Sequence, residues 1–128
     1  MNKEIKERWI TALESGEYIH GVNALKKSSE GEIAYCCLGV LCDMYIKETG
    51  TASWHEPNSS GICEFLNSGQ EQGIGNSAFL PDIVIGWSGM KDSRGVFTDD
   101  TDKRVSLVGV NDSSEDFGRV IECIEKYF

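Results

Sequence analysis

The sequence predicts a single α+β domain, residues 1–128, in which a small antiparallel sheet packs with a central buried helix and with amphipathic helices at the N- and C-terminal ends. Apolar residues recur at helical spacing near both ends of the chain. An almost continuous apolar run, residues 36–46, is typical of a helix that is buried on all sides. Strand-forming runs at 95–97 and 105–110 predict a hairpin. A length of 128 residues suits one hydrophobic core.

The first helix is expected from Lys3 to Ser15, with Asn2 as its N-cap and Gly16 at its end. Its apolar face is formed by Ile5, Trp9, Ala12 and Leu13. Residues 16–31 contain many turn formers and no sustained period, so they predict a loop with room for a short strand. A brief strand is expected at 33–35.

The central helix begins after the paired cysteines and ends in the polar segment 47–50. Gly39 in its interior costs about 1 kcal/mol of helix stability relative to alanine. Its presence therefore indicates that another part of the backbone approaches the helix closely at this position.

Residues 51–77 are rich in glycine, serine and asparagine and predict a long irregular excursion, interrupted by an apolar island at 62–66. Leu80-Pro81-Asp82 is typical of a helix start, and the following Ile83, Val84 and Trp87 give that short helix an apolar face.

The acidic turn 99–102 is expected at the tip of the hairpin between residues 95–97 and 105–110. Asn111 and Asp112 would then lie at the end of a strand, either in a turn or directed at a ligand. Ser113 and Asp116 resemble a capping box that begins the last helix. The apolar stripe of that helix comprises Phe117, Val120, Ile121, Ile124 and Phe128.

The composition narrows the range of functions. The formal net charge of −9 opposes attraction to a phosphate backbone, so we expect no nucleic-acid partner. The same charge leaves open an acidic inhibitor or DNA mimic that occupies the basic groove of a nuclease. The first eight residues lack the apolar core of a signal peptide, and no apolar run approaches the ~20 residues that span a bilayer. The sequence therefore predicts a cytoplasmic protein without a membrane partner.

Five cysteines form an odd set without a CxxC pair or histidines at zinc-ligand spacing, so no metal and no cofactor are expected. Buried thiols that pack as small hydrophobic groups are the favoured interpretation. The alternative is a cysteine hydrolase in which Cys36 or Cys37 is activated at a helix N-terminus, with His20 or His55 as the base. Phosphate-binding glycine loops and the common hydrolase motifs are absent from the sequence.

Rings are frequent in the irregular segments: Tyr18, His20, Trp54, His55, Phe79, Trp87 and Phe97. Polar side chains accompany them: Asn23, Arg94, Arg104, Asn111 and Asp112. Such groups can stack a flat base and hold a ribose or a phosphate, provided that they meet in one cavity. Core packing is the competing interpretation for each ring taken singly, above all for Trp9 and Trp87 on apolar helical faces.

Three segments carry a resemblance to a known family: residues 9–18, Gly21 with Ala24-Leu25, and the run Tyr35-Cys36-Cys37-Leu38-Gly39-Val40-Leu41-Cys42-Asp43. Together with Leu80-Pro81, Val84, Trp87 and Val110-Asn111-Asp112, they resemble a family of small proteins of phages and prophages. The chain is also similar to the Thoeris anti-defence sponge proteins, which bind a cyclic ADP-ribose isomer and thereby silence host immune signalling.

That resemblance implies a homo-oligomeric protein in an infected or lysogenic bacterial cell that sequesters a small nucleotide ligand without catalysis. It places ligand contacts at Trp9 with Tyr18, at Phe79, and at Asn111 with Asp112. An arginine is expected on the phosphates, for which Arg104 is the candidate, and His20 completes the expected set. The resemblance implies a basic residue directly after Gly21, but this chain has Val22 there, so one expected phosphate contact is missing.

Overall fold

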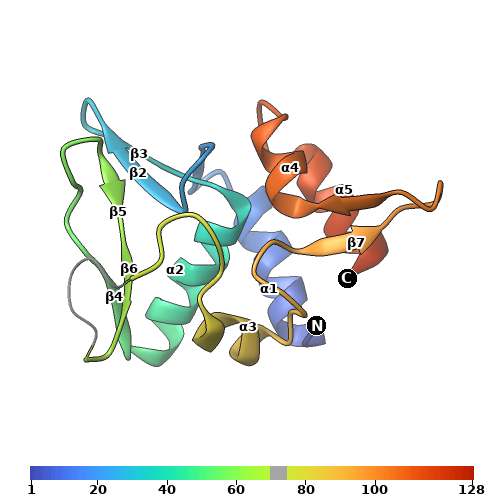
Figure 1. Cartoon of the computed structure of the whole chain (residues 1–128), viewed down its shortest axis with the longest axis horizontal. Coiled ribbons are helices and arrows are strands. Elements are labelled where there is room, and N and C mark those ends of the chain that lie inside the picture. Colours follow the sequence, from blue (N-terminus) through green and yellow to red (C-terminus); the bar gives the residue numbers. More distant parts are fainter. Residues whose placement is uncertain (70–74) are drawn as a thin grey trace.

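Helix α2, Cys37–Thr49, lies in the middle of the computed structural model, which describes residues 1–69 and 75–128. In Figure 1, two of the small sheets lie on one side of α2, and the N- and C-terminal helices lie on the other together with a β-hairpin. Every residue from Cys37 to Tyr45 is buried. The expectation of a central buried helix is therefore confirmed.

The glycine in α2 marks the predicted close approach of another backbone segment. A Cβ added at Gly39 would lie 1.7 Å from the carbonyl oxygen of Leu25. The same carbonyl accepts a hydrogen bond from the backbone N–H of Cys36 at 3.3 Å. A side chain at position 39 would therefore push the segment before β2, Lys26–Ser29, away from the helix.

Both terminal helices are amphipathic, as predicted. Helix α1, Lys3–Glu14, is capped by Asn2, whose Oδ1 accepts from the N–H of Ile5 at 3.0 Å. Helix α5, Gly118–Tyr127, packs against α1. The buried apolar residues of these two helices are Ile5, Trp9, Leu13, Val120 and Ile124.

The capping box predicted for the last helix is wrong. Ser113 instead closes α4, Leu107–Asp112, and donates through its hydroxyl to the carbonyl of Gly109 at 2.8 Å. The carboxylate of Asp116 accepts from the N–H of Gly118 at 2.9 Å in the turn before α5. Helix α5 therefore begins several residues later than the capping-box pattern indicates.

Within the described residues, short strands form three small sheets, and all pairs but one are antiparallel. The largest has the order β1-β3-β2-β5, in which β1 and β3 are parallel. The strands are β1 (Ile19–His20), β2 (Lys26–Ser29), β3 (Glu32–Tyr35), β4 (Ala52–Trp54), β5 (Ile62–Cys63), β6 (Phe65–Asn67), β7 (Val96–Thr98) and β8 (Arg104–Ser106). The α+β class is confirmed, but residues 16–31 and 51–69 contain more strand than predicted. Residues 70–74 of the predicted excursion lie outside the described ones.

The hairpin of β7 and β8 is present, but its second strand is shorter than predicted. The hydroxyl of Ser106 accepts from the N–H of Gly109 at 3.1 Å and starts helix α4 at Leu107. The run 107–110 is therefore helical, because a serine N-cap outweighs the strand preference of its leucine and valines. Asn111 and Asp112 consequently lie at the end of a helix and not at a strand end.

Helix α3, Asp82–Ser88, begins after Pro81 as predicted and ends at Gly89, whose φ is 74°. None of the helices in the described ranges combines the length and apolar character that crossing a lipid bilayer requires.

Candidate functional site

Asn111 joins α4 to the start of α2. Its side chain is fully buried, and its Oδ1 accepts from the N–H of Cys37 at 3.0 Å. Its Nδ2 donates to the carbonyl of Gly21 at 2.9 Å and to Oδ1 of Asp112 at 3.0 Å. All the hydrogen-bonding groups of this amide are therefore used inside the protein. Asn111 positions the site but has no free polar atom to offer a ligand.

Asp112 and Phe79 border a common cavity of about 180 Å³, which we call the Phe79 pocket. The pocket lies where four segments meet: the turn before β2, the start of α2, the segment before α3, and α4. Its lining is formed by Asn23, Ala24, Cys36, Ala78, Phe79, Val108 and Asp112. Two of the predicted ligand residues are thus brought together.

Asp112 contributes the carboxylate of this pocket. It is partly exposed, and its Oδ1 accepts from the N–H of Asn23 at 3.3 Å as well as from Asn111. Asn23 has a left-handed φ of 64°, which asparagine tolerates better than most residues. Among residues 1–69 and 75–128, both hydrogen bonds of this carboxylate involve Oδ1, which leaves Oδ2 to accept from a ligand donor.

Phe79 contributes a ring that is 36% exposed. The guanidinium carbon of Arg94 lies 4.6 Å from the centre of that ring, in cation–π geometry. Within residues 1–69 and 75–128, the guanidinium makes no ion pair. The pair therefore places a cation beside the aromatic ring that lines the pocket.

Tyr18 belongs to a different cluster, centred on the carboxylate of Asp43. The hydroxyl of Tyr18 donates to Oδ2 of Asp43 at 2.6 Å, and Nε1 of Trp54 donates to Oδ1 at 3.0 Å. The ammonium of Lys47 lies 3.1 Å from the same carboxylate. Burial opposes ionisation of Asp43, but these three donors outweigh it and hold the pKa of the carboxyl below its usual value.

Sequence reasoning did not single out Asp43, although an acidic residue inside an apolar helix is a signal that could have found it. Burial and the hydrogen bond to Asp43 raise the pKa of Tyr18. Its hydroxyl is therefore a structural donor at neutral pH and is not poised to act as a base.

His20 faces the C-terminal part of the chain. Its Nε2 lies 2.9 Å from the backbone oxygen of Asn111, and its ring packs edge-on against Phe117 at 5.1 Å. Tyr18 and His20 line a broad groove of about 460 Å³ together with Leu13, Glu14, Gly16, Ile19, Glu115, Asp116, Phe117, Gly118 and Ile121. Three carboxylates lie in that lining, so the groove is acidic.

Trp9 and Arg104 do not belong with the other predicted ligand residues. The indole of Trp9 has no exposed surface, and its Nε1 donates to the carbonyl of Cys37 at 2.9 Å. The prediction that Trp9 contacts a ligand is wrong for this reason. Arg104 lies on β8, exposed to solvent, and is not part of the lining of the Phe79 pocket. Arg94 is not part of that lining either, but its guanidinium lies against the ring of Phe79, which is.

The rings do not converge on one cavity as expected. Phe79 lines its own pocket, Tyr18 and Trp54 meet at Asp43, and Trp87 packs edge-on against Tyr45. Phe97 stacks on Tyr127 at 4.7 Å and borders another cavity. The expectation that the rings meet in a single cavity is therefore wrong, because they lie in several separate clusters.

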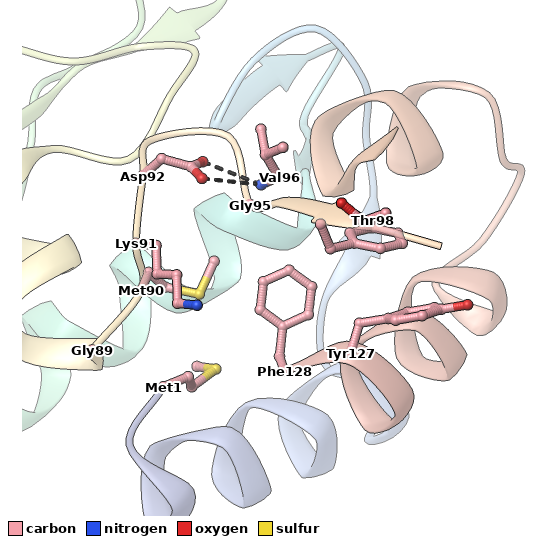
Figure 2. Close-up of a pocket in the computed structure, with 11 residues that line it drawn as sticks. Met1, Gly89, Met90, Lys91, Asp92, Gly95, Val96, Thr98, Tyr127 and Phe128 are labelled. Atoms are coloured by element: carbon pink, nitrogen blue, oxygen red, sulfur yellow. Dashed lines mark hydrogen bonds between the residues drawn. The ribbon is translucent and has the colours of Figure 1, made fainter. Parts of the chain in front are cut away.

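That other cavity, which we call the Phe128 pocket, has a volume of about 300 Å³ and is shown in Figure 2. It lies between the N-terminal residue, the connection from α3 to β7, strand β7 and the end of α5. Met1, Met90, Lys91, Phe97 and Phe128 are among its lining residues. No periodicity or motif in the sequence indicates this pocket, because its walls come from four segments that are far apart in the chain.

The cysteines are all free, and four of the five are buried. Burial raises the pKa of the Cys36 thiol to about 11 and raises that of Cys37 well above its usual value. Cys36 lines the Phe79 pocket, but its thiol stays protonated at neutral pH and its sulfur accepts from the N–H of Gly39 at 3.4 Å. These features favour packing over nucleophilic attack.

Over the described ranges, no three histidine, cysteine, aspartate or glutamate side chains are grouped so that they could hold a metal ion. No curated protein and no solved structure shows significant similarity to the chain. One family matches it over residues 1–128, from the first residue to the last. The chain therefore belongs to the family described as "Domain of unknown function (DUF8296)".

Proposed function

We propose that the chain is a phage-type anti-defence protein that sequesters a small cyclic nucleotide immune signal, of the cyclic ADP-ribose class, without chemical change. The observation that carries this proposal is the Phe79 pocket, where a partly exposed ring and a carboxylate occur together with a nearby guanidinium. The resemblance to phage sponge proteins supplies the class of ligand.

Each group in the Phe79 pocket matches one part of a nucleotide. The ring of Phe79 can stack a base, which contributes about 1–3 kcal/mol in known base–aromatic pairs. Oδ2 of Asp112 can accept from an exocyclic amine or a ribose hydroxyl. Arg94, beside Phe79, can donate to a phosphate in a bidentate arrangement. The protonated thiol of Cys36 in the same lining supports binding over catalysis.

The size of the pocket bears on the oligomeric state. About 180 Å³ is less than the roughly 300–1,000 Å³ of pockets that enclose a drug-sized molecule, so one protomer encloses a single ring system. Val22 and Phe79 are both more than a third exposed, and Val22 directly precedes the pocket residue Asn23. A homo-oligomer in which a second copy covers this apolar rim would complete the enclosure.

Calorimetric titration of the chain with cyclic ADP-ribose isomers tests the proposal. The matched variants are Phe79→Ala and Ile83→Ala, because the two side chains are 36% and 40% exposed and only the first lines the pocket. Loss of base stacking should weaken binding by about 5- to 150-fold in Phe79→Ala. Ile83→Ala should bind like the parent. Intact ligand should be recovered on denaturing the complex.

Failure of every isomer to bind would contradict the sequestration proposal, as would equal affinity of the two variants. Recovery of a cleaved ligand would show that the protein is an enzyme. Size-exclusion chromatography with light scattering checks the oligomer. A monomer that encloses the ligand fully would contradict the proposed role of a second copy.

A second candidate, an acidic inhibitor of a host nuclease, is favoured by the groove that carries Glu14, Glu115 and Asp116. The carboxylates of this groove complement a basic protein surface. The chain should bind an arginine-rich peptide with an affinity that falls as the salt concentration rises. That affinity should also fall when Glu115 and Asp116 are changed to glutamine and asparagine. Unchanged affinity in that double variant would remove the groove as the contact surface.

A further inference from the structure

The Phe128 pocket combines a wall of rings and thioethers with the side chain of Lys91. Its volume of about 300 Å³ falls in the range of pockets that enclose small organic molecules. It is separate from the Phe79 pocket, since the two share no lining residue. A ligand of the Phe128 pocket can therefore be proposed independently of the nucleotide site.

The apolar wall is built from rings that hold one another in place. Phe97 stacks on Tyr127 with an interplanar angle of 21°, and Phe128 meets Phe97 edge-on with centroids 5.7 Å apart. The thioethers of Met1 and Met90 complete the wall, as Figure 2 shows. Aromatic faces and flexible thioether chains adapt well to a flat apolar guest.

Lys91 supplies the cation. In Figure 2 its amino group is directed toward the hollow bordered by Phe128. Across residues 1–69 and 75–128, Lys91 takes part in no ion pair. Its ammonium therefore has donors to offer a ligand.

The neighbouring carboxylate is already engaged. Asp92 accepts from the N–H of Arg94 at 2.9 Å and from the N–H of Val96 at 3.2 Å, the latter contact being drawn as dashed lines in Figure 2. These bonds direct Asp92 at the backbone of its own loop. Lys91 thus remains free to hold an anion beside the aromatic wall.

We propose that the Phe128 pocket binds a small aromatic carboxylate, with its ring against Phe97 and Phe128 and its carboxylate on the ammonium of Lys91. An aromatic body and one negative charge are the two features that this lining recognises together. The ligand differs from the cyclic nucleotide of the Phe79 pocket in size and in the absence of a phosphate requirement.

The three methionines allow a direct test on the full chain. Met1 and Met90 line the pocket, whereas Met44 lies in α2 and is not part of the lining. With ¹³C-labelled methionine methyl groups, titration with 1-naphthoate should shift the signals of Met1 and Met90 and leave that of Met44 in place. The neutral analogue 1-naphthalenemethanol should bind about tenfold more weakly, because it lacks the charge-assisted hydrogen bond.

Lys91→Gln should remove the preference for the anion, and Lys27→Gln, an exposed lysine on β2, should retain it. Phe79→Ala should bind 1-naphthoate like the parent, which separates this proposal from the nucleotide site. The proposal is overturned if neither compound shifts Met1 and Met90, if the acid and the alcohol bind equally, or if Lys91→Gln keeps the tenfold preference.

Discussion

Replacement of Asn111 by alanine is expected to destabilise the fold strongly. The buried amide makes three hydrogen bonds, to Cys37, Gly21 and Asp112, at 2.9–3.0 Å. One of them satisfies the first N–H of α2, which has no partner within its own helix. At about 1 kcal/mol for each lost bond, Asn111→Ala should lower the free energy of unfolding by about 3 kcal/mol. The melting temperature should fall by on the order of 10 °C.

Urea unfolding followed by far-UV circular dichroism measures this loss, since a two-state transition gives the free energy from the midpoint and slope. Asp112→Ala is the matched control. It removes a partly exposed carboxylate that accepts from Asn111 and Asn23, so its cost should be about 1 kcal/mol. A loss below about 1 kcal/mol in Asn111→Ala, or equal losses in both variants, would refute the assignment of Asn111 as the cap that joins α4 to α2.

Three further outcomes are expected. The pKa of Asp43 is lower in the folded than in the unfolded chain, so the ionised carboxylate stabilises the fold. This stabilisation is complete above the unfolded pKa of about 3.9 and is lost as the pH falls through the folded pKa. Asp43→Asn should therefore flatten the decline of stability below pH 4 in acid titrations followed by tryptophan fluorescence, and an unchanged decline would contradict this. Gly39→Ala should lower the free energy of unfolding, measured in urea, by about 1–3 kcal/mol, because the added methyl group meets the Leu25 carbonyl. An unchanged free energy of unfolding would contradict the close approach. In the native protein a thiol reagent should modify Cys123 rapidly and the other four cysteines only on unfolding, and several fast-reacting thiols would contradict their burial.

Elements with a strong period could be predicted from the sequence. Helices α1 and α2 follow from apolar spacing and from a continuous apolar run, and Asn2 and Gly50 mark ends that the structure confirms. Local patterns suffice there because the helix itself aligns the apolar side chains. The close approach at Gly39 was predictable for the same reason, since a helix interior rarely retains glycine without need.

Strand β2 could not be predicted, because its sequence Lys-Lys-Ser-Ser has no strand preference. It is a strand because it pairs with β3 on one side and with β5 on the other. The turn at Glu30 and Gly31, with φ of 51° and 81°, sets its register with β3. Such pairing depends on segments far apart in the chain, and residue preferences do not report it.

The candidate site was predicted only in part, and α4 shows why. The sequence predicts a strand up to residue 110, which puts Asn111 and Asp112 at a strand end and leaves their roles open, whereas the structure has helix α4 there. Consecutive residues of a helix point in different directions. Asn111 accordingly points into the protein and joins α4 to α2, and Asp112 points to the Phe79 pocket. Asn111 thus joins α4 to the start of α2, and Asp112 supplies the carboxylate of the pocket. Under the proposed function, stability therefore depends mainly on the first residue of the pair and ligand affinity on the second.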